Sequence, residues 1–176
     1  MGARKQCAYS SRKSRLQSLT RMRCRTRPPS RLHHKLIIEQ IFMAITYKTI
    51  HDFSEQDLKE LFLSVEWSSG HFPEKLVIAM KNFKTVVSAW DGDKLVGMIC
   101  AMDDGIMNAY VHYLLVRPEY QGKGIGKVLV EKVKDVYKDY LRIVVVAYDK
   151  EMDFYAHCGF KKATDASPMF ITSLWT

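Results

Sequence analysis

Three glycines stand close together in the segment Gly122–Gly126, shortly after an apolar stretch that ends at Val116. Glycines leave the backbone N–H groups of a turn uncovered, because they carry no side chain. The residues that follow have the spacing of an amphipathic helix, and the N-terminal end of a helix attracts negative charge. Together these features predict a binding site for an anionic group such as a phosphate.

The spacing of the glycines excludes two common phosphate loops. A dinucleotide-binding turn needs the pattern G-x-G-x-x-G, and here Lys127 stands where the third glycine belongs. A P-loop needs Ser or Thr after its Gly-Lys pair, and Gly126-Lys127 is followed by Val128. The pattern that is present is Gln121-x-x-Gly124-x-Gly126, after a strand that ends in V-x-P.

This pattern resembles the coenzyme A loop of the GNAT superfamily of N-acetyltransferases, whose signature is [QR]-x-x-G-x-[GA] after such a strand. The resemblance covers residues 43–176. It implies an α/β (α+β) domain with the GNAT acyl-CoA N-acyltransferase fold, a mixed central sheet of six or seven strands and about four helices. It also implies an acyltransferase that takes acetyl-CoA as cosubstrate, in which an amine attacks the thioester directly.

The resemblance implies two kinds of contact to the cosubstrate. Backbone N–H groups of the loop hold the pyrophosphate, and the free edge of the preceding strand pairs with the pantetheine amides. A backbone N–H near Leu114 is expected to face the thioester oxygen. The predicted cosubstrate-binding residues are Leu114, Leu115, Val116, Gln121, Gly122, Lys123, Gly124, Ile125, Gly126 and Lys127.

A candidate general acid lies near the C-terminus. The residues Phe154-Tyr155-x-x-x-Gly159-Phe160 resemble the F-Y-x-x-x-G-F element of the same family. In that element the tyrosine commonly donates a proton to the sulfur of coenzyme A. A phenol with a pKa near 10 is a suitable donor to a thiolate of similar basicity. Tyr155 is therefore the predicted general acid.

The general base is less well determined. An alkylamine with a pKa of about 10.4 is almost entirely protonated at neutral pH, so a group must accept its proton. His112 is the leading candidate, because it titrates in the useful range and lies four residues before Val116. The arylalkylamine N-acetyltransferase branch also places a strand histidine there. Glu66 acting with a water chain remains an alternative.

The acceptor pocket is expected between the first two helices, in the segment Trp67–Phe72. Its aromatic and polar groups suit an amine with an apolar body, and Glu66, Trp67 and His71 are the predicted substrate-binding residues. A packed loop is the other interpretation of this segment. Two pairs of residues farther along the chain have two interpretations each. Asp103-Asp104 either attracts a cation or forms a turn. Met169-Phe170 either forms a wall of the pocket or packs in the core.

The elements that must position these residues follow from the hydrophobic pattern. Strands are expected at Thr46–Ile50, Lys84–Trp90, Lys94–Met102, Ala109–Val116 and Arg142–Tyr148, the last one buried, with one or two more from Phe160 to Leu174. Helices are expected after a cap at Ser54, from Pro73, over Gly124–Tyr137, and from a cap at Asp149 to Gly159.

The net charge of +8 belongs to one end of the chain. Residues 1–42 hold 11 Lys and Arg and one acid, whereas residues 43–176 hold 16 Lys and Arg and 18 acids. The basic segment is expected to be a disordered extension. It is compatible with an organelle presequence, with a nucleic-acid-binding arm, or with a non-native leader before a natural start at Met43. The non-native leader is the favoured interpretation, and it predicts a cytoplasmic protein. Since the domain itself is slightly acidic, nucleic acid is not an expected partner.

The cysteines and the apolar runs argue against a metal-binding protein and against a membrane-spanning one. Cys7, Cys24, Cys100 and Cys158 form no C-x-x-C pair, so reduced thiols and no metal are expected. No apolar run reaches 18 residues, so no membrane span is expected.

The leading function is thus acetyl transfer to a small primary amine. The resemblance also implies that the protein is able to form a homodimer. The alternatives are acetylation of a protein lysine or N-terminus, and a non-catalytic acyl-CoA-binding module. The acceptor itself and the oligomeric state are not determined by the sequence.

Overall fold

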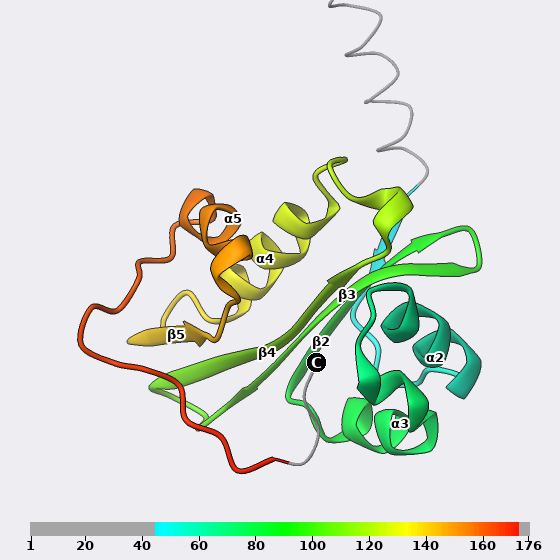
Figure 1. The fold of residues 1–176 in the computed structure, drawn as a ribbon, viewed down its shortest axis with the longest axis horizontal. Helices are drawn as coiled ribbons and strands as arrows, with labels where there is room; N and C mark the ends of the chain where they lie inside the picture. Colours follow the sequence, from blue (N-terminus) through cyan, green and yellow to red (C-terminus); the bar gives the residue numbers. More distant parts are fainter. Residues whose placement is uncertain (1–44, 173–176) are drawn as a thin grey trace, which may run out of the picture.

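The computed structural model describes residues 45–172 and forms one twisted sheet with helices on both faces (Figure 1). The sheet has the order β1-β2-β3-β4-β5, antiparallel from β1 to β4 and parallel between β4 and β5. The strands are β1 (Ile45–Lys48), β2 (Thr85–Asp91), β3 (Lys94–Asp103), β4 (Asn108–Val116) and β5 (Arg142–Val145). The helices are α2 (Glu55–Ser64), α3 (Pro73–Asn82), α4 (Ile125–Val136) and α5 (Met152–His157), with single 3-10 turns η1 (Ser68–His71), η2 (Pro118–Tyr120) and η3 (Asp149–Glu151).

Each face of the sheet has its own core. Helix α4 buries the apolar stripe Ile125, Leu129, Val130 and Val133 against one face. Helices α2 and α3 cover the other face, where Leu58, Leu61, Phe62, Leu76 and Met80 are buried. The helical spacing of these residues in the sequence predicts such buried faces. The structure confirms the four predicted helices and the α/β class.

Local signals determine where the first two helices begin. The Ser54 hydroxyl accepts a hydrogen bond from the backbone N–H of Asp57 at 3.1 Å, which caps α2 as expected. Pro73 is the first residue of α3, where its missing N–H costs nothing. Along residues 45–172, no helix is long and apolar enough to cross a membrane.

The prediction of six or seven strands is wrong for the described residues, which form five. Residues 160–172, expected to contain one or two strands, have no strand pairing, and the end of that prediction lies outside the described residues. A strand is stable only when its backbone groups find partners on a neighbouring strand. Pro168 removes one donor from this segment, so its apolar residues alone do not make it part of the sheet.

The last parallel strand also differs from its prediction. β5 ends at Val145 instead of Tyr148, and its residues alternate between exposed and half-buried instead of being buried throughout. The outer face of β5 is uncovered within residues 45–172, and Val144 is 39% exposed. Asp149 begins the turn η3 and makes no capping hydrogen bond, so the predicted cap at this residue is wrong.

Gly97 determines how closely β3 approaches β4. A methyl group at this position would lie 2.9 Å from the carbonyl oxygen of Leu115, which belongs to the backbone and cannot move aside. We expect Gly97→Ala to lower the free energy of unfolding by about 1–3 kcal/mol, as overpacking of a core does. Urea unfolding followed by circular dichroism measures this change, and an unaltered midpoint would contradict it.

Candidate active site

Strands β4 and β5 pair over only part of their length. The parallel pairing runs from Asn108 opposite Arg142 to Val111 opposite Val145 and stops there. On its other edge β4 stays paired with β3 as far as Val116, which lies opposite Gly97. The edge of β4 after Val111 therefore has no neighbouring strand on the β5 side within residues 45–172, and its backbone groups face the gap between the two strands.

An irregularity in β4 determines where His112 lies. Cys100 of β3 pairs with Tyr113, whereas the next residue, Ala101, pairs with Val111, so His112 is an extra residue in β4. The bulge interrupts the alternation of side chains between the two faces of the sheet. As a result, His112 and Tyr113 lie together, with ring centroids 4.1 Å apart, although they are consecutive in a strand.

The glycine loop has the conformation that exposes backbone N–H groups. Gly122 has φ 71° and Gly124 has φ 83°, values at which residues with a side chain are strained. Gly124 occupies the N-cap of α4, and no side chain caps this helix end. The first N–H groups of α4 are therefore available to an anion, in the arrangement that the sequence predicted.

Neighbouring side chains hold this loop in place. The Gln121 amide donates a hydrogen bond to the carbonyl oxygen of Val116 at 2.9 Å, which connects the loop to the end of β4. A methyl group at Gly126 would lie 3.4 Å from the Phe154 ring, so α4 and α5 approach closely here. The Lys123 ammonium lies 4.7 Å from the centre of the Tyr120 ring and adds positive charge beside the loop.

Tyr155 lies on α5, in the setting that its sequence element implies. The helix ends with hydrogen bonds from the Phe160 N–H to the Tyr155 carbonyl and from the Gly159 N–H to the Ala156 carbonyl, both at 3.0 Å. Burial, and secondarily the charge of Glu151, raises the pKa of Tyr155 to about 12. The phenol is therefore protonated at neutral pH and can act as a proton donor.

His112 lies among aromatic rings on the side of the sheet that α2 and α3 cover. Its ring centroid is 5.9 Å from that of Phe83 and 5.8 Å from that of Tyr110. Removal of water by these neighbours lowers the pKa of His112, although part of the side chain stays exposed. The imidazole is therefore mainly neutral at pH 7 and can accept a proton.

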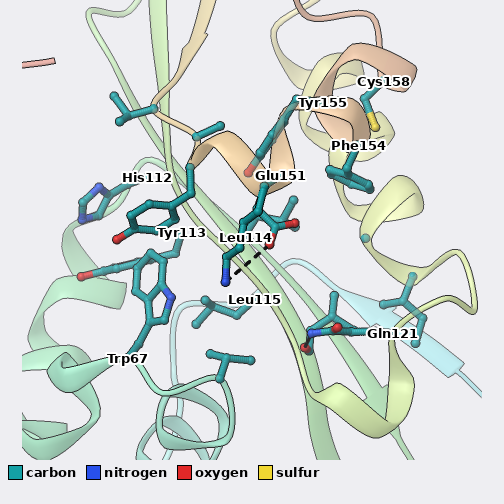
Figure 2. A pocket seen from close by; sticks show the side chains of 18 of the residues that line it. Trp67, His112, Tyr113, Leu114, Leu115, Gln121, Glu151, Phe154, Tyr155 and Cys158 are labelled. Carbon is teal, nitrogen blue, oxygen red and sulfur yellow. Dashed lines mark hydrogen bonds and ion pairs between the residues drawn. The ribbon is translucent and has the colours of Figure 1, made fainter. Parts of the chain in front are cut away.

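A cavity of about 1190 Å³ joins the glycine loop, the open edge of β4 and the aromatic residues. Figure 2 shows Tyr155 pointing into it from α5, with Leu114 and Leu115 of β4 below and Trp67 on the side of α2. Most of the predicted site residues line it: Glu66, Trp67, His112, Leu114, Leu115, Val116, Gln121, Gly122, Gly124, Ile125, Gly126, Lys127 and Tyr155. Two predicted residues, His71 and Lys123, are not among those that line the cavity, and His71 is exposed at the end of η1.

Glu66 adopts an unusual backbone conformation. Glu66 has φ 61°, and among residues 45–172 it is the one non-glycine residue with a positive φ. Such a conformation costs about 1–3 kcal/mol, and residues that adopt it cluster at active sites and ligand-binding segments. Here it lies between α2 and η1, next to Trp67, and both residues line the cavity.

Two residues of the site region have no signal in the sequence pattern. Arg117 is buried: its Nε donates to the Leu95 carbonyl at 2.7 Å, and its terminal nitrogen lies 3.1 Å from the Glu60 carboxylate. It thereby fixes the end of β4 to β3 and α2. Glu151 lines the cavity one helical turn before Tyr155, and its carboxylate lies 3.9 Å from the Lys150 ammonium (dashed in Figure 2).

The pair Asp103-Asp104 has structural roles. Asp103 accepts hydrogen bonds from the Tyr137 hydroxyl at 2.9 Å and from the Gly105 N–H at 2.7 Å. Asp104 accepts three backbone N–H bonds within the turn, which hold its pKa well below the usual range. These contacts support the interpretation of both residues as turn residues. Residues 45–172 contain no group of three His, Cys, Asp or Glu side chains arranged as metal ligands.

Comparison with known protein families gives a match over most of the described residues. The family model described as the acetyltransferase (GNAT) family matches residues 49–160. This chain belongs to the GNAT family. A solved structure of a GNAT family acetyltransferase from Streptococcus pneumoniae has 28% sequence identity to it and a TM-score of 0.63, over 73% of this chain and 98% of that one. The fold class and the acyltransferase class predicted from the sequence are those of the family.

Curated relatives differ in what they act on. GCN5-related N-acetyltransferase 2, chloroplastic, from Arabidopsis thaliana is 43% identical over 39% of this chain and 27% of its own length. Histone acetyltransferase TAP1 from Glycine max is 31% identical over 70% of this chain and 57% of its own. Thialysine N-epsilon-acetyltransferase from Bos taurus is 38% identical over 34% of this chain and 38% of its own. The chain thus spans between about a quarter and three-fifths of these relatives.

The GNAT family uses acetyl-CoA, and the residues present fit this cosubstrate. Gly122 and Gly124 leave the N–H groups at the start of α4 open to a diphosphate, and a methyl group at Gly122 would meet no atom within 4 Å. Lys127 lines the same part of the cavity with a positive charge. The free edge of β4 offers backbone donors and acceptors to the amides of an extended chain.

Proposed function

We propose that the protein is an acetyl-CoA-dependent N-acetyltransferase that transfers acetyl by direct attack to a small primary amine. One observation carries this proposal: the glycine loop, the free edge of β4 and the Tyr155 side chain all line one cavity, together with aromatic residues. A site for the acyl carrier and a site for an acceptor are thereby continuous. No covalent acyl-enzyme is needed for transfer between two molecules that meet in this way.

Acetyl-CoA supplies the activated acetyl group when it is bound. The backbone of Gln121–Gly126 holds its diphosphate, and an N–H of β4 near Leu114 stabilises the negative charge that develops on the carbonyl oxygen. His112 accepts the proton that the attacking amine loses as its nitrogen bonds to the acetyl carbon. Tyr155 donates its proton to the sulfur as the carbon–sulfur bond breaks, and it recovers a proton from solvent.

The role of His112 predicts a pH dependence. A base must be unprotonated to act, so activity rises with pH through its pKa, which is lowered below 6.5 in this protein. We expect His112→Gln to lower kcat by about tenfold to a hundredfold and to abolish this rise in kcat/KM on the acid side of about pH 6.5. Glu66→Gln is the comparison, because Glu66 is the alternative base. If only Glu66→Gln abolishes the rise, the base is Glu66.

The proposed function is tested by the release of free coenzyme A thiol. Purified protein is incubated with acetyl-CoA and a panel of primary amines, and thiol is measured with and without each amine. We expect release that depends on the amine. Absence of release with every amine, while calorimetry shows that acetyl-CoA binds, would contradict the proposal and favour a non-catalytic acyl-CoA-binding module.

Acetylation of a protein lysine or N-terminus is the second candidate function, and the match to a histone acetyltransferase favours it. The thialysine acetyltransferase match favours a small amine. The aromatic residues around the cavity support the small amine, because they offer contact area to an apolar body. A panel of lysine peptides in the same thiol assay distinguishes the two candidates.

The cellular location also belongs to the proposal. The chloroplastic relative favours the organelle interpretation of residues 1–42 over the cytoplasmic one. Residues 1–44 lie outside the described part of the chain. Expression of the full chain fused to a fluorescent protein, with and without residues 1–42, separates the two interpretations.

A further inference from the structure

Arg117 is a buried cation with no part in the proposed proton transfers. Its two neighbours in the chain, Val116 and Pro118, line the cavity, whereas Arg117 is not among the lining residues and is 8% exposed. Removing a guanidinium from water is costly unless its donors find partners. A buried ion pair often adds no net stability compared with apolar side chains of similar size, so stability alone does not explain an arginine at this position.

The partners of Arg117 belong to two different elements. Its Nε atom donates a hydrogen bond to the carbonyl oxygen of Leu95 on β3 at 2.7 Å, and its terminal nitrogen lies 3.1 Å from the carboxylate of Glu60 on α2. The Gln56 amide donates a hydrogen bond to the other oxygen of that carboxylate at 2.7 Å. Gln56 and Arg117 together hold the pKa of Glu60 below its usual range, so the partner of Arg117 stays charged at neutral pH.

These contacts lie at the point where β4 leaves the sheet. The pairing of β4 with β3 ends at Val116, and the Arg117 N–H then donates to the Val96 carbonyl at 2.9 Å. The next residue, Pro118, has no N–H group and cannot donate a further hydrogen bond to β3. The side chain of Arg117 therefore holds the chain to β3 and α2 at a point where the backbone of the following residue cannot.

The glycine loop starts from this point. The Arg117 carbonyl accepts a hydrogen bond from the Tyr120 N–H at 2.8 Å across the turn η2, and the Gln121 amide donates to the Val116 carbonyl at 2.9 Å. Gly124, three residues after Gln121, is the N-cap of α4. The place of the open N–H groups of α4 relative to the edge of β4 thus depends on how firmly the residues around Arg117 are held.

We propose that Arg117 is a positioning residue for the cosubstrate: its guanidinium fixes the end of β4, and through it the glycine loop, in the arrangement that receives the diphosphate of acetyl-CoA. This inference rests on the proposed function. Hydrogen bonds from the loop to an anion weaken steeply when donor and acceptor are displaced or misaligned. Loss of the guanidinium therefore weakens the contact with the diphosphate. The thioester end is affected less, because Leu114 is held by its pairing with Ile99 of β3.

Two thioesters test this role: acetyl-CoA, and S-acetylpantetheine, which has the same thioester and amides but no diphosphate. We expect Arg117→Met, which keeps an apolar stem, to raise the Kd for acetyl-CoA in titration calorimetry about tenfold, as loss of about one hydrogen bond to a charged group does. With an amine that the thiol assay identifies as an acceptor, kcat/KM should fall about tenfold for acetyl-CoA and stay unchanged for S-acetylpantetheine. Arg117→Lys keeps the charge without the planar fork, and its Kd should rise about threefold.

Thr85→Val gives the matched control for lost stability. Thr85 is buried, its hydroxyl lies 2.7 Å from that of Tyr137, and it is not among the residues that line the cavity. The substitution removes a buried hydrogen bond and nearly preserves the volume of the side chain, so it should lower the midpoint of urea unfolding. Its Kd for acetyl-CoA, measured well below the unfolding transition, should equal that of the wild type.

The outcomes separate the two levels of inference. If the wild-type protein binds acetyl-CoA but acetylates no amine, the proposed function fails, and the Kd of Arg117→Met still decides the role of Arg117. An unchanged Kd for Arg117→Met, an equal loss of kcat/KM with both thioesters, or an equal rise in Kd for Thr85→Val would overturn that role while the proposed function stands. If Arg117→Met does not fold, Arg117→Lys decides, and a Kd equal to that of the wild type overturns the role.

Discussion

Replacing Tyr155 with Phe should lower kcat at least tenfold, while acetyl-CoA binds with unchanged affinity. The substitution removes one hydroxyl and keeps the ring that packs between Phe154 and Phe160, at centroid distances of 5.2 and 5.6 Å. Loss of a general acid lowers rates by about 10²–10⁴-fold, and water in the cavity can replace part of this function. Steady-state kinetics together with calorimetry of acetyl-CoA binding measure the two quantities.

The pKa of Tyr155 adds a second expectation. Because burial raises this pKa to about 12, the phenol stays protonated, and kcat should not fall as the pH rises to about 10. Tyr140→Phe is a suitable control, since its hydroxyl contacts Asp103 at 3.3 Å, and the residue is not among those that line the cavity. Equal kcat values for Tyr155→Phe and wild type would show that another group protonates the sulfur.

Replacing Gly122 with Asp should weaken acetyl-CoA binding by about thirtyfold. Gly122 has φ 71°, and a methyl group there meets no atom within 4 Å, so there is room for a side chain. Asp tolerates this conformation better than most residues. By Coulomb's law, a carboxylate placed close to a bound phosphate charge, at an effective dielectric constant of about 20, costs on the order of 2 kcal/mol. That energy corresponds to about thirtyfold in Kd.

Gly122→Asn is the matched control, because Asn has the same shape and the same tolerance of this backbone but no charge. We expect it to change the Kd only a few-fold. Calorimetry with acetyl-CoA at low and high salt measures both variants, and salt should reduce the effect of Asp. Similar Kd values for the two variants would place the diphosphate elsewhere and remove the main support for the cosubstrate site.

The parts of the site that the sequence predicts are those made by residues near one another in the chain. The glycine loop and the helix after it are of this kind, because the left-handed glycines and the uncapped end of α4 follow from a few adjacent residues. The cap at Ser54 and the start of α3 at Pro73 are local as well. The assignment of Tyr155 depends on a short element within α5 and the turn that ends it.

The errors occur where a partner strand decides the structure. The segment after Phe160 has the composition of a strand, yet within residues 160–172 it pairs with no strand, since composition cannot supply a neighbouring edge. β5 is shorter and more exposed than its apolar residues suggest, for the same reason. His71 is of another kind: it is not among the residues that line the cavity, and its contact with the acceptor stays a prediction.

The sequence by itself determines the fold class, the family and the conformation of the glycine turn, because each follows from local spacing or from a short motif. Only the tertiary structure shows that His112 is the extra residue of a bulge, that β4 and β5 separate after Val111, and that Phe170 lies along the cavity although it is 57% exposed. These features arise from contacts between segments far apart in the chain. A shift of one residue in such a pairing turns every side chain to the opposite face, so the register of the strands decides which groups meet in the cavity.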